Sequence, residues 1–229
     1  MKLSVKLLLA LAIVFFSLQI VNALYIRNYL KGHISGDNLG EGFAGKKVRP
    51  FKHLKVMASS ENGGMVKIEN APEFQVKYFF QLEDKLNFEN RGDTLLVTLK
   101  EGYYNIENNK GAFPVVVSCP ELESVDIQNS SVKFVDYNNP KIKINANHGQ
   151  VRFEDKQYLK ELDLNLANES SLHFYLFEPY KLDKIVAKMS NGSTISMPDV
   201  FPTEFYLKNT DDCKLELNGA TMKKVKPLK

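Results

Sequence analysis

Short stretches in which apolar and polar residues alternate recur about every 20 residues in the C-terminal part of the chain. In each stretch two apolar residues flank one polar residue, and turn residues such as Asn, Ser or Gly come just before it. Alternation with a period of two is typical of a β-strand that buries one face. The stretches are SSVKF (130–134), QVRF (150–153), SLHF (171–174), TISM (194–197) and DCKL (212–215).

A repeat of this length, built from two or three short strands and polar turns, predicts a solenoid. The chain lacks the Asn/Cys ladder and the helical half of a leucine-rich repeat, so a parallel β-helix with one repeat per coil fits better. Equivalent residues then stack about 4.8 Å apart in successive coils and bury their apolar side chains only against each other. Two inward columns are expected: Val132, Val151, Leu172, Ile195 and Cys213, and Phe134, Phe153, Phe174, Met197 and Leu215.

Residues 49–120 carry a different pattern of short strands separated by turn-forming clusters. No segment here has a helical period of useful length. The expected fold is therefore all-β, with a short-strand N-terminal section that continues into the β-helix. The expected strands are FKHLKVMA (51–58), MVKIEN (65–70), EFQVKYFF (73–80), KLNFEN (85–90), TLLVTLKE (94–101) and FPVVVSCP (113–120).

The N-terminus is a separate hydrophobic segment. Two lysines precede a nearly unbroken apolar run, Leu7 to Val21, and small residues then offer a cleavage site after Ala23, which is the pattern of an export signal. If the helix continues to Ile26, the run reaches 20 residues and is long enough to remain as a membrane anchor. Both alternatives imply export to the periplasm or the cell surface. The expected organisation is a signal peptide or anchor (1–28), a polar Gly-rich tether (29–48) and the β-helix domain (49–229).

Charge and residue spacing exclude several classes of partner. A total of 30 Lys and Arg against 27 Asp and Glu gives a net charge of +3, which predicts no strong attraction to nucleic acid. The four histidines lack metal-ligand spacing, and no metal or other cofactor is expected.

Cys119 lies in the first coil and Cys213 in the last, several steps of about 4.8 Å apart, beyond the disulfide limit of about 7 Å. Both cysteines are therefore expected to remain unpaired.

The chain from residue 49 onward resembles the putative auto-transporter adhesin head GIN domain family of bacterial envelope proteins. The resemblance rests on RPFKHLKV (49–56), NRGDTLLVTL (90–99) and FPVVVSCPELESVDIQNSSVKF (113–134), followed by the repeats. It implies a right-handed β-helix exported to the periplasm or cell surface behind an N-terminal anchor and polar tether. These motifs are diffuse hydrophobic patterns, and the resemblance supplies no functional residue.

One outward column is a candidate binding site. The residue between the two apolar positions of each stretch points outward, and the five together form a mostly basic row: Lys133, Arg152, His173, Ser196 and Lys214. Such a row could hold an anionic polymer such as an acidic glycan or a lipopolysaccharide core. The alternative is an ordinary solvated strand face whose charge is neutralised by neighbouring Glu and Asp residues. Aromatic residues near the turns, such as Tyr137, Tyr158 and Tyr175, could contact sugar rings or only seal the corners.

Catalysis is not expected. β-Helix enzymes that act on polysaccharides need clustered carboxylates on one face, whereas Asp126, Asp163 and Asp183 lie at different distances from their stretches. The chain also has no nucleophile elbow, phosphate loop or zinc motif. We expect an exported, membrane-tethered, non-enzymatic module for adhesion or binding at the bacterial cell envelope. The alternatives are a structural envelope protein with a protein partner and a small polysaccharide-active enzyme.

Overall fold

The computed structural model describes residues 43–59, 64–100, 115–210 and 212–228, together with Phe15, Gln19 and Asn22, which are helical. The expected signal peptide or anchor and most of the expected tether lie outside the described residues. Within the described part, no helix is long and apolar enough to span a bilayer. Contacts divide the chain at Phe43, and residues from Ala44 onward form one compact unit, the solenoid, which is described below.

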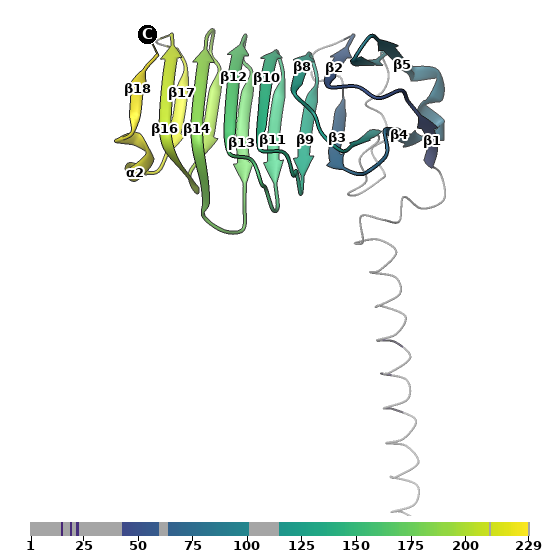
Figure 1. Cartoon of the computed structure of the whole chain (residues 1–229), viewed down its shortest axis with the longest axis horizontal. Coiled ribbons are helices and arrows are strands. Elements are labelled where there is room, and N and C mark those ends of the chain that lie inside the picture. Colours follow the sequence, from purple (N-terminus) through teal and green to yellow (C-terminus); the bar gives the residue numbers. More distant parts are fainter. Residues whose placement is uncertain are drawn as a thin grey trace, which may run out of the picture. The chain divides into compact units, whose positions relative to one another are not determined.

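The solenoid has about five turns, with coils about 21 residues long, and confirms the expected all-β class. Two nine-stranded sheets form its walls (Figure 1). Sheet 1 contains, in spatial order, β1 (Phe43–Lys47), β4 (Gln75–Phe79), β7 (Val115–Cys119), β3 (Met65–Asn70), β9 (Ser131–Val135), β11 (Gln150–Glu154), β13 (Ser171–Tyr175), β15 (Thr194–Met197) and β17 (Lys214–Leu217). Sheet 2 contains β18 (Val225–Pro227), β16 (Val200–Asn209), β14 (Tyr180–Met189), β12 (Glu161–Ala167), β10 (Lys141–Asn147), β8 (Ser124–Gln128), β2 (His53–Ala58), β6 (Thr94–Leu99) and β5 (Leu86–Arg91).

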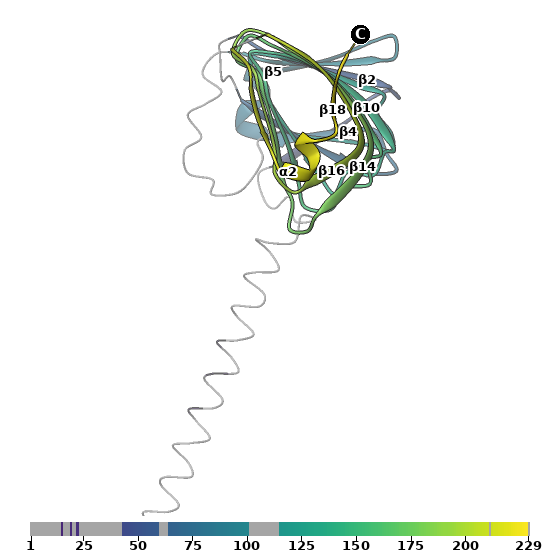
Figure 2. The same ribbon diagram turned by 90° about the vertical axis from the view of Figure 1, so that its left-hand side faces the viewer.

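The core fills the space between the two sheets, which meet at corners when the solenoid is viewed along its length (Figure 2). From β8 onward, each coil supplies one strand to each sheet, and equivalent strands pair in parallel with their neighbours. Alternate residues of every strand therefore point inward, where apolar side chains are covered by the coils on either side. Phe134, Phe153 and Phe174 stack in this way, with ring centroids 4.6 and 4.7 Å apart.

The expected inward columns are correct for four coils and wrong for the fifth. Val132, Val151, Leu172 and Ile195 are in register as expected, but the next member is Leu215 rather than Cys213. Similarly, Leu217 follows Met197. The reason lies in the preceding turn, where the Cys213 amide donates to the Thr210 carbonyl at 3.2 Å and holds Cys213 before β17 begins.

The N-terminal section contains all six expected strands, as β2 to β7. Two of its elements were not expected. A 3-10 helix, η1 (Phe80–Lys85), connects β4 to β5. The strand β1 lies in the stretch expected to be tether and forms an edge of sheet 1 beside β4. Its sequence FAGKK has no apolar alternation because an edge strand of this kind buries little of either face.

Asparagines line the corner that leads from sheet 2 to sheet 1. Asn129, Asn168 and Asn191 adopt positive φ values of 53–54°, a conformation that asparagine tolerates better than most residues. The Asn191 side-chain amide donates to Asn168 Oδ1 at 2.7 Å, and the Asn168 amide donates to Asn147 Oδ1 at 2.8 Å. These side-chain bonds run along the solenoid from coil to coil and fix the corner in each one.

Gly149, at the corner between β10 and β11, has no room for a side chain. A Cβ added to Gly149 would lie 2.8 Å from Ile127 Cγ2 and 3.2 Å from the Ala146 Cβ. We expect Gly149→Ala to lower the free energy of unfolding by about 1–3 kcal/mol, the usual cost of overpacking a core. Chemical denaturation followed by circular dichroism measures this change. Gly219→Ala is the matched control, because nothing lies within 4 Å of a Cβ there, and an equal loss in both variants would contradict the steric argument.

The two cysteines are free, as expected. Cys119 in β7, the third strand of sheet 1, and Cys213 before β17, its last strand, are six strand spacings or roughly 29 Å apart. Burial, with a smaller contribution from the nearby Glu121 carboxylate, raises the pKa of the Cys119 thiol to about 12.

The thiols should therefore react at very different rates. We expect iodoacetamide at pH 8 to modify Cys213 in the folded protein and Cys119 only after unfolding, because the thiolate is the nucleophile. Peptide mass spectrometry measures both sites. Comparable labelling of the two thiols before unfolding would contradict the buried position of Cys119.

Candidate functional site

The structure brings together three of the four candidate basic residues. Lys133, Arg152 and His173 are in register on β9, β11 and β13 and point away from the core. The row continues through Ser196 to Glu216, which takes the place expected for Lys214. Lys214 lies beside Thr194 in the neighbouring row, because β17 is shifted by two residues from the expected register. The row is therefore basic at one end and acidic at the other.

The lysines of the row are neutralised. Lys67 on β3 is in register with Lys133 and extends the row by one basic position. Lys67 Nζ lies 2.9 Å from Glu69 Oε2, and Lys133 Nζ pairs with the Glu154 carboxylate. In each pair the carboxylate comes from the next outward row: Glu69 follows Lys67 by two residues on β3, and Glu154 follows Arg152 by two residues on β11. Neutralisation by neighbouring acidic residues, the alternative considered from the sequence, is thus present at Lys67 and Lys133, and these two lysines add little net charge to the surface.

Arg152 differs from these lysines. Its Nη2 donates to Gln150 Oε1 at 2.8 Å, but its guanidinium forms no ion pair with any carboxylate in the described part of the chain. The Nε–H of Arg152 is buried and no described residue accepts its hydrogen bond. A buried donor without an acceptor costs free energy, more so when the group is charged. Arg152 therefore carries an unpaired positive charge in the middle of the row, together with a buried Nε–H that lacks an acceptor.

His173 is a neutral member of the row. Burial lowers the pKa of its imidazole, and the positive charge of Arg152 lowers it further, against a smaller opposite effect of Glu216. The ring stacks on Tyr175 with centroids 5.8 Å apart. At neutral pH the imidazole accordingly acts as a hydrogen-bonding and stacking group next to Arg152 and adds no positive charge.

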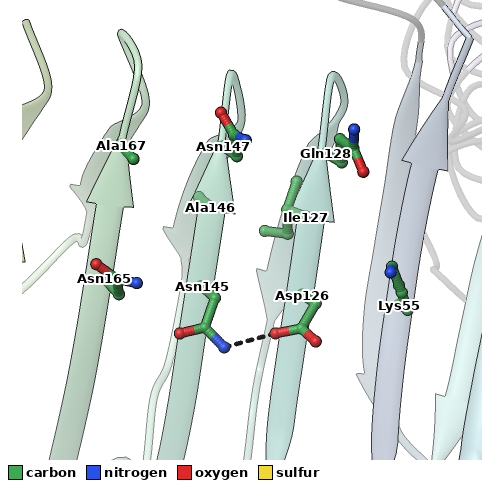
Figure 3. Close-up of a pocket in the computed structure, with 9 residues that line it drawn as sticks. All are labelled: Lys55, Asp126, Ile127, Gln128, Asn145, Ala146, Asn147, Asn165 and Ala167. Atoms are coloured by element: carbon green, nitrogen blue, oxygen red, sulfur yellow. Dashed lines mark hydrogen bonds between the residues drawn. The ribbon is translucent and has the colours of Figure 1, made fainter. Parts of the chain in front are cut away.

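Sheet 2 carries a second polar surface that the sequence reasoning did not identify. Lys55, Asp126, Asn145 and Asn165 are in register on β2, β8, β10 and β12, as Figure 3 shows. The Asn145 amide donates to Asp126 Oδ1 at 2.6 Å. With a second row containing Gln128 and Asn147, these residues line a shallow hollow of about 310 Å³. The signal was present in the sequence, because these residues occupy the outward positions of the same apolar alternation.

The turn aromatics have two different roles. Tyr137 is fully buried, its hydroxyl donates to the Leu122 carbonyl at 3.2 Å, and burial raises its pKa. Tyr180 donates to the Leu159 carbonyl, and burial raises its pKa to about 12. These two residues seal corners. In contrast, Tyr158 and Tyr175 are more than half exposed, and so their rings are available for contacts outside the chain.

Among the described residues, no group of three or more His, Cys, Asp or Glu side chains is arranged so that it could hold a metal ion.

No protein-family model and no curated protein matches the chain. Solved structures with some similarity include a "putative adhesin" from Parabacteroides distasonis, 13% identical with a TM-score of 0.44, where the match covers 78% of this chain and 83% of that one. A "putative adhesin" from Bacteroides fragilis is 12% identical with a TM-score of 0.41, over 77% of this chain and 92% of that one. A "putative lipid binding protein" from P. distasonis is 12% identical with a TM-score of 0.37, over 83% and 98%. With identities of 12–13% and TM-scores below 0.5, these similarities decide neither the family nor the ligand of this chain.

Proposed function

We propose that this chain is an exported, membrane-tethered, non-enzymatic solenoid that binds an anionic glycan at the bacterial cell envelope. The observation that carries the proposal is Arg152, an unpaired guanidinium with a buried, unused Nε–H in the middle of an in-register outward row. The hydrophobic N-terminal segment followed by a polar stretch supports export and tethering.

The geometry favours a carboxylate or sulfate group on an extended chain. A guanidinium presents a planar fork of donors that matches such groups and is less strongly hydrated than an ammonium. Arg152 is flanked by the paired Lys133 on one side and the neutral His173 on the other, at the roughly 4.8 Å spacing of neighbouring strands. One anionic group would be held at Arg152, while the flanking side chains contact the neighbouring sugar units.

A glycan array tests the proposal. We expect the full-length protein in detergent to bind acidic glycans, and Arg152→Gln to weaken binding about tenfold. Binding should also weaken as salt rises to about 150 mM, because exposed charges are screened. The matched control is Lys188→Gln on sheet 2, which removes an equal charge outside the row and should bind like the unaltered protein.

Two results would contradict the proposal. Equal losses in Arg152→Gln and Lys188→Gln would show that overall charge, and not the row, governs binding. Release of shorter products from a bound glycan would show that the solenoid is an enzyme.

A further inference from the structure

A second surface lies at the turns of two neighbouring coils. One turn joins β11 to β12 and the other joins β13 to β14, and these strands pair with each other, so the turns are adjacent. Together they enclose a hollow of about 390 Å³, within the range of roughly 300–1,000 Å³ typical of small-molecule sites. Its lining includes Asp155, Gln157, Tyr158, Phe177, Glu178 and Tyr180.

Aromatic rings are unusually exposed in this hollow. Phe177 is 90% exposed and Tyr158 is 58% exposed, although the equivalent corner of the preceding coil buries Tyr137 completely. Single exposed apolar side chains are common on protein surfaces, but several that gather around one hollow indicate a contact surface. Neither ring is needed to close its own coil, because Tyr180 performs that role with its hydrogen bond to the Leu159 carbonyl.

Gln157 provides an independent indication of a ligand. Its side chain is only 6% exposed, and its Nε2 donates to the Glu154 carbonyl at 2.5 Å. The Oε1 of the same amide is buried, and no described residue donates a hydrogen bond to it. A buried acceptor without a donor is uncommon in folded proteins and is costly. Gln157 lines the hollow, and a turn of its amide toward a bound ligand would let a ligand hydroxyl donate to this oxygen.

We propose that this hollow, which we call the turn groove, is a subsite for a neutral sugar ring. The apolar face of a pyranose stacks on exposed aromatic rings, here Tyr158 and Phe177, and its hydroxyls donate to buried acceptors such as Gln157 Oε1. The carboxylates of Asp155 and Glu178 supply further acceptors at the rim.

The alternative occupants fit the groove less well. An acyl chain would leave the Gln157 acceptor without a donor and would place apolar carbon next to the charged rim of Asp155, Lys156 and Glu178. An anionic ligand would be disfavoured, because the two carboxylates of the lining outnumber its one cation, Lys156. The turn groove therefore differs in chemistry from the Arg152 row, and its occupation by a neutral sugar does not depend on the proposed anionic ligand.

Binding of neutral oligosaccharides tests the inference. The full-length protein in detergent is titrated calorimetrically with cellohexaose, maltohexaose, chitohexaose and mannohexaose. We expect at least one of them to bind, and we expect Phe177→Ala and Tyr158→Ala each to raise its dissociation constant about tenfold. Gln157→Met, which removes the unused acceptor, should also weaken binding. Phe80→Ala is the matched control, because Phe80 is 57% exposed but lies on η1 outside the groove, and it should bind normally.

Other outcomes would overturn it. Failure of all four oligosaccharides at millimolar concentration would do so, as would binding that is unchanged in both aromatic variants or equally weakened in Phe80→Ala. Sedimentation of the protein with phosphatidylcholine vesicles in a Phe177-dependent manner, without sugar binding, would assign the groove to a membrane surface instead. Because Phe177 and Tyr158 are exposed, their variants should retain the unfolding temperature of the unaltered protein, and loss of binding then reports on the groove. None of these results changes the expected effect of Arg152→Gln on acidic glycans.

Discussion

Phe153→Ala is expected to lower the free energy of unfolding of the solenoid by about 3–5 kcal/mol, the usual cost of truncating a fully buried phenylalanine. The Phe153 ring is fully buried and lies between Phe134 and Phe174, nearly parallel to both, with interplanar angles of 11° and 12°. Its removal leaves a cavity in the middle coil and deprives both neighbouring rings of a packing surface. Guanidinium denaturation followed by far-ultraviolet circular dichroism measures the loss.

A graded series makes this prediction specific to the stack. Phe153→Leu keeps most of the apolar volume and should cost less than Phe153→Ala, whereas Phe80→Ala removes an exposed ring and should cost no more than about 0.5 kcal/mol. Because each coil contacts only its neighbours, a weakened middle coil should also make the transition less cooperative. A loss below about 1 kcal/mol in Phe153→Ala would contradict the view that the ring stack holds adjacent coils together.

The alternation of apolar and polar residues was sufficient to predict the coils, because inward positions in a solenoid are buried on both sides and tolerate only apolar side chains. It failed at the last coil for a physical reason. Both DCKL and KLEL alternate correctly, and the choice between them depends on the turn at Thr210, which holds Cys213 outside β17. Alternation specifies which residues can share a face, but turn length specifies the register.

The candidate sites were less predictable than the fold. The sequence placed Lys133, Arg152 and His173 in one row, but the pairing of Lys133 with Glu154 joins positions on different strands and different rows. The exposure of Tyr158 and burial of Tyr137 depend on how each turn folds over its neighbour, which alternation does not report. The sequence therefore indicates which residues point outward, while the structure is needed to show which of them lack a partner.

The C-terminal end of the solenoid is protected by a modified coil. The short strands β17 and β18 flank the helix α2 (Gly219–Met222), which lies at one corner of the end of the solenoid in Figure 2. The Thr221 hydroxyl is buried and donates to the Val200 carbonyl at 2.8 Å. The edge strand β18 has only three residues and includes Pro227. Short strands that contain proline are typical of edges that resist pairing with other chains.

Truncation after Thr210 should therefore increase self-association of the solenoid. Loss of the last coil exposes the inward faces of β15 and β16, including Ile195 and Phe205, together with the backbone edges of β15 and of the ten-residue β16. Light scattering of both chains in the same detergent should show larger assemblies for the truncated one. Thr221→Val removes only the buried hydroxyl and should lower stability modestly without increasing the size of the assemblies. If the truncated chain formed no larger assemblies than the full chain and kept an unchanged unfolding temperature, the last coil would not be a cap, and the end of β16 would have to be stable as an open edge.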